Sequence, residues 1–455
     1  MNFECRGMLA RRSPREGGGM SEVNRRTFCM TTAGAVAAGG LAARASAEGP
    51  NETIRAAVLG VNGRGVTHIG GFMGAKGVQV ALLCDPDQVV LDKRAKEFEK
   101  KYGVKVETET DLRKVFDRKD IDVVGVATPN HWHSLAAIWA CQAGKDVYVE
   151  KPGSHNLFEG RKMVEAAKKY NRIVQHGVQL RSSEAVQEAV KHLRQGTIGK
   201  VYMARGLVYR RRPSIGHAKD PDVAPKTLDW NIWQGPAPER AYSKRIVHYN
   251  WHWHWDYGNG DVGNQGVHET DMCLWGLGLE TLPSEIVAMG GKFLFDDDKE
   301  TPELLSSSYK FPETNQMIEF EVRPWDTNQE AGAGVGNLFY GSEGYLVVRG
   351  YNQYETFLGP KGQPGPKNKD KDGDPVAKHF ANFIEAVRRR KTSIQHGPVE
   401  TAHTSSGLAH LGNIAYRLNR KLNFDPKTER FLGDSEADGM LTRHYRAPFV
   451  VPENV

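Results

Sequence analysis

Cysteine is scarce in this sequence, and no two cysteines have the spacing of a metal-binding pair. Five of the 455 residues are cysteine, and Cys5 and Cys29 fall within the N-terminal leader. The remaining three, Cys84, Cys141 and Cys273, form an odd and widely separated set with no CxxC pair. The sequence therefore excludes a disulfide framework and a cysteine-based zinc site.

The sequence also has little excess of positive over negative charge. The formal net charge is +6, but the first 47 residues contain seven Arg and three Glu and account for +4 of it, which leaves +2 for the rest of the chain. No dense run of Lys and Arg follows. Because nucleic-acid binding depends on a concentrated basic surface, we expect no nucleic-acid partner.

The N-terminal part has no hydrophobic run long enough for a membrane anchor, but it has the features of an export signal. A twin-arginine motif occupies residues 24–28, a weakly apolar Ala- and Gly-rich stretch occupies residues 30–41, and small residues precede and include Ala47. The apolar stretch is far shorter than the roughly 20 residues that a membrane span needs. We therefore expect residues 1–47 to be a twin-arginine signal peptide, and the mature protein to be periplasmic or otherwise exported, with no stable membrane anchor after cleavage.

After this leader, short apolar runs alternate with helical patterns. A buried strand at residues 54–59 stops at a glycine-rich turn, residues 60–65, and a helix can continue over residues 66–73. Such a turn lets backbone N–H groups approach a pyrophosphate at a helix N-terminus. It departs from GxGxxG because Asn62 occupies the middle glycine position and Gly63 is shifted by one, although Asn tolerates a left-handed backbone better than most residues. Taken alone, the turn fits an ordinary glycine-rich loop as well as a dinucleotide site.

An acidic residue after the next strand favours the dinucleotide site. The strand at residues 78–84 ends at Asp85, which lies 20 residues past Gly65. A carboxylate at this place accepts hydrogen bonds from the adenosine ribose hydroxyls and repels a 2′-phosphate. The sequence therefore predicts NAD as the cofactor in preference to NADP. The alternative, a simple acidic strand-end cap, is common, but strand, glycine turn, helix, strand and acid in this order are harder to obtain by chance.

The alternation continues to His176 and predicts a doubly wound parallel sheet of about six strands over residues 51–176. The further strands are expected at residues 123–127, 146–149 and 172–176, and the further helices at residues 89–102, 111–118, 134–143 and 157–170. One strand runs into Thr128-Pro129-Asn130-His131 and the next into Glu150-Lys151-Pro152. Ligands of open α/β sheets bind at the carboxyl ends of the strands, so Lys151 is placed to point toward the nicotinamide end.

The second half, residues 177–455, has a different texture. Strands are expected at residues 201–208, 285–290, 306–311, 316–322 and 345–349. Because few helices separate them, they predict a large, mainly antiparallel sheet in a second α/β domain. We expect a loop at residues 359–374, which are rich in Gly, Pro, Lys and Asp, and a helical tail over residues 379–455 that packs back on the domain.

Aromatic, histidine, amide and acidic side chains are concentrated at residues 251–271, in a pattern typical of a polar-ligand pocket with stacking faces. The same aromatic residues would also suit an interface or core packing. The histidine pairs His131/His133 and His252/His254 suggest a metal site, but no third ligand has a telling spacing, so we expect no metal.

Together, the glycine turn, Asp85, residues 128–131, residues 150–152 and residues 264–268 resemble the Gfo/Idh/MocA oxidoreductase family, named for glucose–fructose oxidoreductase and inositol dehydrogenase. The resemblance covers nearly everything after the leader. With the twin-arginine motif, the stretch at residues 263–268 and Asp425-Pro426, the chain is similar to the exported branch of that family. The resemblance implies an N-terminal Rossmann domain and a C-terminal α/β domain whose open sheet often builds dimers or tetramers. We therefore expect a homodimer or homotetramer.

The resemblance also implies roles for individual residues. Lys151 corresponds to the family's lysine near the nicotinamide and the reacting hydroxyl, and His268 to its active-site histidine. Asn264 stands four positions before His268, where polyol dehydrogenases of the family commonly have Asp, and an amide cannot accept a proton as a carboxylate does. A simple Asp–His relay is therefore not predicted. The candidate catalytic residues are Lys151, His268 and Asn264.

The residues expected to bind the cofactor are Gly60, Asn62, Gly63, Arg64, Gly65, Asp85, Thr128, Asn130, His133, Glu150, Lys151 and Gln179. Those expected to bind the substrate are Arg181, His252, Trp253, His254, Asp256 and His268.

These features lead to one function and two alternatives. The leading hypothesis is an exported NAD-dependent oxidoreductase that transfers hydride between a tightly bound nicotinamide cofactor and a sugar, cyclitol or related polyol. His268, with an ordinary pKa near physiological pH, would take the hydroxyl proton, and Lys151 would stabilise alkoxide character. The alternatives are a redox-neutral glycoside hydrolase or lyase, which combines oxidation, elimination and hydride return, and a non-catalytic sugar-binding protein. Export favours a cofactor regenerated in place, because no exchangeable nicotinamide pool is expected outside the cytoplasm.

Overall fold

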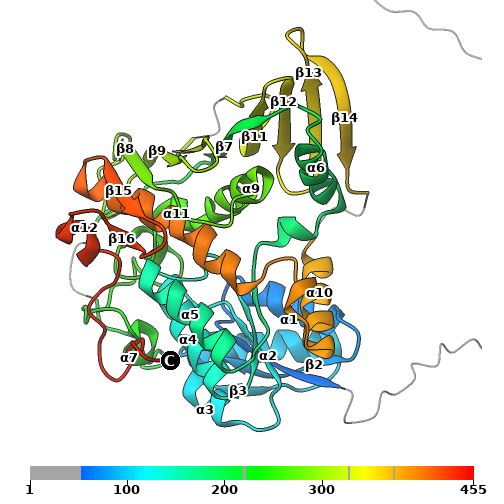
Figure 1. The fold of residues 1–455 in the computed structure, drawn as a ribbon. Coiled ribbons are helices and arrows are strands. Elements are labelled where there is room, and N and C mark those ends of the chain that lie inside the picture. Colours follow the sequence, from blue (N-terminus) through cyan, green and yellow to red (C-terminus); the bar gives the residue numbers. More distant parts are fainter. Residues whose placement is uncertain (1–52, 219–221, 326–327, 372–374) are drawn as a thin grey trace, which may run out of the picture. The chain divides into compact units, whose positions relative to one another are not determined.

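The computed structural model describes residues 53–218, 222–325, 328–371 and 375–455, and Figure 1 shows their fold. The predicted signal peptide, residues 1–47, lies outside the described residues. Among the helices that are described, none is long and apolar enough to cross a membrane.

The first half forms the predicted doubly wound sheet. Its six parallel strands have the order β3-β2-β1-β4-β5-β6. The strands are β1 (Ile54–Leu59), β2 (Val78–Cys84), β3 (Glu107–Glu109), β4 (Val123–Val126), β5 (Asp146–Val149) and β6 (Val174–His176). The order reverses between β1 and β4, and in such sheets ligands bind in the crevice at that switch point.

Helices cover both faces of this sheet (Figure 1). They are α1 (Gly65–Gly74), α2 (Gln88–Tyr102), α3 (Leu112–Asp117), α4 (Asn130–Gln142) and α5 (Leu157–Lys169). Alternate residues of β1 point to opposite faces: Ala56 and Val58 pack with α1 and α2, whereas Ala57 and Leu59 pack with α3, α4 and α5. Burial on both faces explains why the strands appear in the sequence as continuous apolar runs.

The helix α4 begins four residues earlier than predicted. Pro129 is its N-cap residue, with an extended backbone at φ −60° and ψ 156°, so Asn130 to His133 form the first turn of the helix rather than a loop. The fixed φ of proline suits this entry into a helix. The first turn therefore stands at the carboxyl end of β4.

The second half contains the predicted, mainly antiparallel sheet. Its ten strands have the order β14-β13-β12-β11-β7-β10-β9-β8-β15-β16, and only β7 and β10 pair in parallel. The strands are β7 (Val201–Tyr209), β8 (Glu285–Gly291), β9 (Leu304–Phe311), β10 (Gln316–Arg323), β11 (Val335–Gly341), β12 (Gly344–Arg349), β13 (Gln353–Leu358), β14 (Gln363–Lys369), β15 (Leu422–Asp425) and β16 (Arg430–Phe431).

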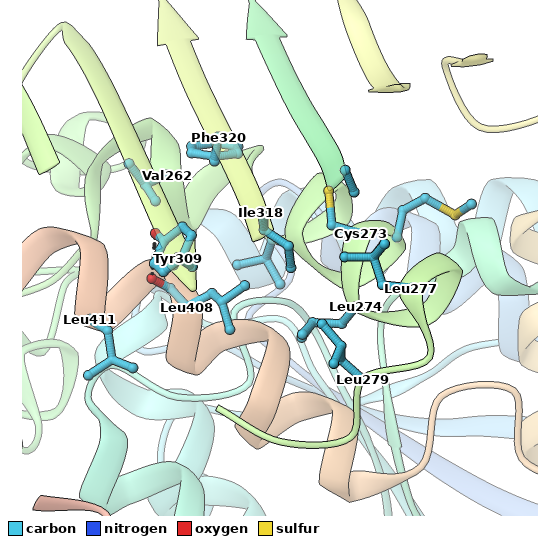
Figure 2. Packing of buried hydrophobic residues seen from close by; sticks show 14 of the residues in the cluster. Val262, Cys273, Leu274, Leu277, Leu279, Tyr309, Ile318, Phe320, Leu408 and Leu411 are labelled. Atoms are coloured by element: carbon cyan, nitrogen blue, oxygen red, sulfur yellow. Dashed lines mark hydrogen bonds between the residues drawn. The ribbon is translucent and has the colours of Figure 1, made fainter. Parts of the chain in front are cut away.

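Helices pack on one face of this sheet through a large apolar cluster. The helices are α6 (Glu184–Arg194), α9 (Val267–Leu277) and α11 (Val399–Leu418). Figure 2 shows Leu274 and Leu277 of α9 and Leu408 of α11 beside Tyr309 and Ile318 of the sheet. This packing fixes α9, which carries His268 in its first turn.

Two predictions about the second half are corrected. Residues 359–374 were expected to form a loop, but they contain β14, which pairs with β13 at the edge of the sheet (Figure 1). An edge strand tolerates Pro364 and Pro366 because one side of its backbone needs no partner. The tail after residue 379 is not helical throughout: α10 (Val376–Arg389) and α11 are followed by the strands β15 and β16 and by the short helix α12 (Ser435–Gly439).

The remaining short elements are α7 (Trp230–Gln234), α8 (Gly260–Asn264) and the 3-10 turns η1 (Gln179–Ser182), η2 (Asn250–Trp253) and η3 (Thr392–Ile394). The elements η1, η2 and α8 contribute residues to the cavity described next.

Candidate active site

A cavity of about 720 Å³ opens at the carboxyl ends of the parallel strands and is lined by residues from both halves of the chain. This volume lies in the range of roughly 300–1,000 Å³ that ligand sites usually have. Most residues that the sequence predicted for the site line it, namely Gly60, Asn62, Gly63, Arg64, Asp85, Thr128, Asn130, His133, Glu150, Lys151, Gln179, His252, Asn264 and His268.

The cavity extends across the sheet. Asp85 follows β2 and Lys151 follows β5, and β1 and β4 lie between these strands. Three strand spacings correspond to roughly 14 Å. An extended ligand, rather than a compact one, fits between these two side chains.

The glycine turn owes its shape to Gly60. Gly60 has φ +80°, and a Cβ atom there would lie 2.7 Å from the backbone oxygen of Ala127, so only glycine fits. Asn62 does not adopt the left-handed backbone that the sequence suggested, because the positive φ falls on Gly60. Instead, the side chain of Arg94 donates to the carbonyls of Val61 and Asn62, at 3.0 and 3.1 Å, and holds the turn.

Two other glycines of the turn have different surroundings. Gly63 has no atom within 4 Å of where its Cβ would be, and it lines the cavity. Gly65 does not line it; a Cβ there would lie 2.0 Å from the oxygen of Gly60. Gly65 therefore packs against the backbone of Gly60 within the turn and does not line the cavity, although it was predicted to bind the cofactor directly.

Asp85 is buried beside this turn. Its Oδ2 accepts a hydrogen bond of 2.9 Å from the N–H of Val61, and its Oδ1 accepts one of 3.2 Å from the N–H of Asp87. Burial raises the pKa of Asp85 to about 6, so the carboxylate is mostly ionised at pH 7. Thr128 Oγ1, also in the cavity wall, is buried without a hydrogen-bond partner among the described residues. The Asp85 carboxylate can accept hydrogen bonds from a ribose of a dinucleotide, and the Thr128 hydroxyl can donate one to a ribose or phosphate oxygen.

Glu150 is a buried anion at the other side of the turn. It accepts hydrogen bonds from Arg64 Nε at 2.8 Å and Gln179 Nε2 at 3.1 Å, and His68 Nε2 lies 3.2 Å away. Although burial opposes ionisation, Arg64 and His68 hold the pKa of Glu150 well below its usual range. Glu150 thereby positions Arg64 and Gln179 in the cavity wall.

Lys151 points across the cavity to the second half of the chain. Its Nζ contacts the backbone carbonyl of Asn264 at the end of α8. Burial lowers the pKa of Lys151 to about 8, against the opposing effect of Glu150. The amine is therefore largely protonated at pH 7. Asn264 acts on Lys151 through its main chain, a contact that its side-chain chemistry did not predict.

His268 lies in the first turn of α9 and lines the same part of the cavity. Burial, together with the nearby charge of Lys151, holds the pKa of His268 well below its usual value. The imidazole is therefore neutral at pH 7, and its Nδ1 has no hydrogen-bond partner among the described residues. A neutral imidazole beside an ammonium group can accept a proton from a bound hydroxyl.

Comparison with known proteins agrees with this geometry. Residues 54–178 match a family model described as "Oxidoreductase family, NAD-binding Rossmann fold", and residues 197–291 and 364–451 match one described as "Oxidoreductase family, C-terminal alpha/beta domain". The chain belongs to the Gfo/Idh/MocA oxidoreductase family.

Curated relatives align with this family member over part of their length. Glycosyl hydrolase family 109 protein 1 of Shewanella sp. (strain ANA-3) is 30% identical over 209 residues, 40% of this chain and 45% of that protein. Levoglucosan dehydrogenase of Pseudarthrobacter phenanthrenivorans is 37% identical over 112 residues, 25% of this chain and 28% of that protein. The aligned region thus spans less than half of either relative.

Solved structures share the fold of this Gfo/Idh/MocA chain. The aldose-aldose oxidoreductase of Caulobacter crescentus, crystallised with glycerol, superposes with a TM-score of 0.63 at 17% sequence identity. The superposition covers 82% of this chain and 100% of that one. The same two-domain architecture is therefore present in both proteins.

Four residues that were predicted to bind substrate lie outside the cavity of this family member. Arg181 forms two hydrogen bonds with the buried carboxylate of Asp271, at 2.7 and 2.9 Å, which draws it into the protein. Trp253 is buried, and Arg212 lies over its ring. These positions correct the prediction for Arg181 and Trp253.

His254 and Asp256 are the other two. His254 Nδ1 lies 3.2 Å from a carboxylate oxygen of Glu300, and Asp256 faces a separate cavity of about 250 Å³ near Arg240. Of the predicted histidine-rich run, His252 alone lines the main cavity, stacked on Trp251 with ring centroids 3.6 Å apart.

Ring nitrogens of His131 and His133, a pair that suggested a metal site, lie beside backbone carbonyl oxygens. His131 Nε2 lies 2.9 Å from the carbonyl oxygen of Trp233, and the two ring nitrogens of His133 lie 2.6 and 2.7 Å from the carbonyls of Pro152 and Thr128. Within the part of the chain that the structure describes, no group of three His, Cys, Asp or Glu side chains could hold a metal ion.

The structure adds a cavity wall that the sequence did not predict. Residues 222–258, here called the clasp, pair with the loop between β2 and α2: the N–H of Gln88 donates to Thr227, and that of Asp229 donates to Pro86, both at 2.9 Å. The clasp closes the Asp85 side of the cavity with four side chains that were not predicted, those of Ile232, Trp233, His248 and Tyr249. His248 Nε2 lies 3.1 Å from Asp87 Oδ2.

A polar network near His268 was also missed. Arg210 follows β7, Gln265 follows α8, and Tyr351 lies between β12 and β13. Arg210 Nη1 donates to Gln265 Oε1 at 2.8 Å, and Gln265 Nε2 donates to the hydroxyl of Tyr351. These residues come from three distant segments, so the sequence did not group them. Only Gln265, three positions before His268, belonged to a motif noted in the sequence.

Proposed function

We propose that this protein is an exported NAD-dependent oxidoreductase that transfers hydride between a tightly held cofactor and a CH–OH group of a sugar, cyclitol or related polyol. The observation that carries the proposal is the pairing of a neutral His268 with a protonated Lys151 at the end of a cavity that also contains the glycine turn and Asp85.

The residues of the first half fit the cofactor. Backbone N–H groups of the turn and the N-terminus of α1 suit a pyrophosphate, and the ionised Asp85 suits ribose hydroxyls and disfavours a 2′-phosphate. This is our reason for proposing NAD in preference to NADP. When bound, NAD supplies the acceptor for the hydride that leaves the substrate carbon.

The residues around His268 handle the proton. Neutral His268 accepts the proton of the substrate hydroxyl as its carbon loses hydride. Lys151, held by the Asn264 carbonyl, donates a hydrogen bond to the same oxygen and stabilises its developing negative charge. His268 therefore accepts the proton, and Lys151 stabilises the negative charge.

The clasp supports tight retention of the cofactor. No pool of exchangeable nicotinamide cofactor is expected outside the cytoplasm, so an exported enzyme needs to retain its cofactor. Residues 222–258 form a wall of the cavity at its Asp85 end. The proposal therefore includes regeneration of the cofactor in place and transport of the folded, loaded protein by the twin-arginine route. Exposed apolar side chains on β8, Val287 and Met289, are 46% and 75% accessible and are consistent with a homodimer or homotetramer.

A second candidate is redox-neutral cleavage of a glycoside, which the glycosyl hydrolase family 109 relatives favour. In this route a ring carbon of the substrate is oxidised, and the neighbouring carbon loses a proton as the aglycone leaves by elimination. In a hydrolysis, water then adds to the resulting double bond before hydride returns to the ring. The same His268 and Lys151 would serve both halves of the cycle.

The first experiment is to purify the protein, denature it and quantify the released NAD and NADP by mass spectrometry. Near-stoichiometric NAD is the expected result. The loaded protein is then given sugars and glycosides, and net NADH and released aglycone are measured separately: bound NADH formed in the presence of a free sugar supports the oxidoreductase, whereas aglycone release without NADH supports the second candidate. A protein that contains no NAD and binds none when it is added would rule out both and leave a sugar-binding role.

A further inference from the structure

The carboxylates and cations that line the main cavity are unequally distributed. Two carboxylates line it, Asp85 at the clasp and Glu150, which binds Arg64. Three cationic side chains line it, those of Arg64, Lys151 and Arg210. The region around His268 therefore contains cationic groups in excess of ionised acids.

Arg210 is the cation whose charge is least compensated. Its one side-chain hydrogen bond goes to the neutral amide of Gln265, and among the described residues no carboxylate oxygen lies within ion-pairing distance of its guanidinium group. Neighbouring arginines differ: Arg212 pairs with Asp261 at 2.6 Å, and Arg211 lies over the ring of Trp325 outside the cavity. The remaining N–H groups of Arg210 are thus available to a ligand.

The amide of Gln265 is fixed in one orientation. Its Oε1 accepts from Arg210, while its Nε2 donates to the Tyr351 hydroxyl and, at 3.3 Å, to Glu269 Oε1. Reversing the amide would turn its NH2 group toward the guanidinium of Arg210, which only donates, so the bond to Arg210 would be lost. Because Tyr351 accepts through its oxygen, its own proton is free to point toward a ligand. Burial raises the pKa of Tyr351, which keeps the phenol protonated.

Glu269 does not supply the missing negative charge. It is 1% exposed, and burial raises its pKa to about 8, so it is mostly neutral at pH 7. Its Oε2 has no hydrogen-bond partner among the described residues. A neutral Glu269 leaves the charge of Arg210 in place and does not repel an anionic group.

From this arrangement we propose that the substrate is a sugar acid, and that Arg210 and the Tyr351 hydroxyl bind its carboxylate beside His268. The proposal rests on the proposed function and specifies its substrate class. A planar guanidinium matches a carboxylate through two parallel hydrogen bonds. Lys151 is assigned to the reacting hydroxyl, so Arg210 is the one cation left for a further negative charge, which favours a carboxylate over a phosphate dianion.

The test measures binding rather than turnover. The NAD-loaded protein, with its cofactor content checked by mass spectrometry, is titrated calorimetrically with three matched sets: glucuronate, glucose and glucose 6-phosphate, and the corresponding galactose and mannose compounds. We expect at least one uronate to bind tenfold or more tightly than its neutral sugar and more tightly than its phosphate, and this preference to fall with added salt. A protein that lacks NAD contradicts the proposed function instead, so the two failures are distinguishable.

Two variants and a control decide which residue is responsible. Arg210→Gln is expected to remove the uronate preference, and Tyr351→Phe, which keeps the ring over His268, to reduce it several-fold. Arg211→Gln, one position away and outside the cavity, should retain it. Thermal melting and NAD content of each variant show whether it has folded. Equal or tighter binding of the neutral sugar in every set, a phosphate preference, or a uronate preference that survives Arg210→Gln in a folded, loaded protein would overturn the proposal.

Discussion

At the scale of single residues, burial sets the protonation states that the chemistry requires. His268 and Lys151 lie in the same part of one cavity, yet burial makes the histidine neutral and leaves the lysine mostly charged at pH 7. Glu150, also buried, stays ionised because Arg64 and His68 surround it. Buried groups thus differ in charge at pH 7 because their ordinary pKa values and their partners differ.

Replacing the proton acceptor should slow chemistry without emptying the site. We expect His268→Ala to lower kcat by roughly 10²–10⁴-fold, the usual contribution of a positioned general base. The bound NAD, quantified after denaturation, should be unchanged, because the turn and Asp85 are intact. His192→Ala, which alters a partly exposed helical histidine outside the cavity, serves as the control. Unchanged turnover in the His268 variant would exclude the proposed role.

The affinity for NAD should depend on pH through Asp85. Its folded pKa is raised to about 6, and ribose binding needs the ionised form, so affinity is nearly full at pH 7 and declines as the pH falls through 6. At pH 5 we expect binding about tenfold weaker than at pH 7, as a single protonation predicts. Calorimetric titration of cofactor-stripped protein measures this. Asp85→Asn should bind weakly and show no such dependence on pH between 5 and 7.

Lys151 should produce an alkaline decline in activity. Because its folded pKa is lowered to about 8, the amine loses its proton, and with it its ability to stabilise an alkoxide, as the pH rises through 8. We expect kcat/KM to fall about tenfold per pH unit above that point. Lys151→Gln should be slow at all pH values with no decline near 8. A profile of the unaltered protein that stays flat to pH 10 would contradict this assignment.

At the scale of elements, two chain segments shape the cofactor end of the cavity: the glycine turn, which is local in sequence, and the clasp, which is not. The turn follows β1 directly, whereas the clasp comes from residues 222–258 and reaches the loop after β2. Each predicts a different consequence of mutation.

The turn should not tolerate a side chain at Gly60. Gly60→Ala would place Cβ 2.7 Å from the backbone of Ala127 and Thr128 at a positive φ, and we expect it to cost ~1–3 kcal/mol of stability and most of the NAD affinity. The matched control is Gly70→Ala in α1, where nothing lies within 4 Å and alanine favours the helix. Chemical denaturation and NAD titration measure both effects.

Loosening the clasp should speed cofactor release. His248→Ala removes the contact with Asp87 and is expected to raise the NAD dissociation rate roughly fivefold, the equivalent of ~1 kcal/mol for one hydrogen bond. His217→Ala, an exposed histidine that pairs with Asp298 outside the cavity, should leave the rate unchanged. Stopped-flow displacement of NAD by a fluorescent analogue gives the rates. Equal rates in both variants would mean that the clasp does not retain the cofactor.

At the scale of the whole molecule, one cavity takes residues from both halves of the chain, so a ligand there should stabilise the fold as a unit. Lining residues range from Leu59 in β1 to Val376 in α10. The protein should therefore melt in a single transition, and removing NAD should lower the temperature of that transition. Restoring NAD at a hundred times its dissociation constant should add about 2.7 kcal/mol of stability. Scanning calorimetry of loaded and stripped protein measures the difference, and identical melting curves would contradict cofactor binding in this cavity.

Several features of the fold followed from local patterns. Continuous apolar runs indicated the buried parallel strands, and the acid after β2 and the lysine after β5 could be assigned to one edge of the sheet, because parallel strands end there together. Edge strand β14 escaped prediction, since its prolines resemble a loop and are tolerated only where one side of the backbone is unpaired. The first turn of α4 escaped it because Pro129 could end a strand or begin a helix.

The sequence by itself determined the doubly wound first half, the mainly antiparallel second half and the places of Asp85 and Lys151 after their strands, because periodicity and spacing are local properties of a chain. The role of His268 came from the resemblance to the family. The tertiary structure decided which polar side chains reach the cavity. It drew Arg181 to Asp271, turned Trp253 and His254 inward, and brought Arg210 and Tyr351 beside Gln265. The physical reason is that charge pairing and burial depend on neighbours distant in sequence, which no local pattern encodes.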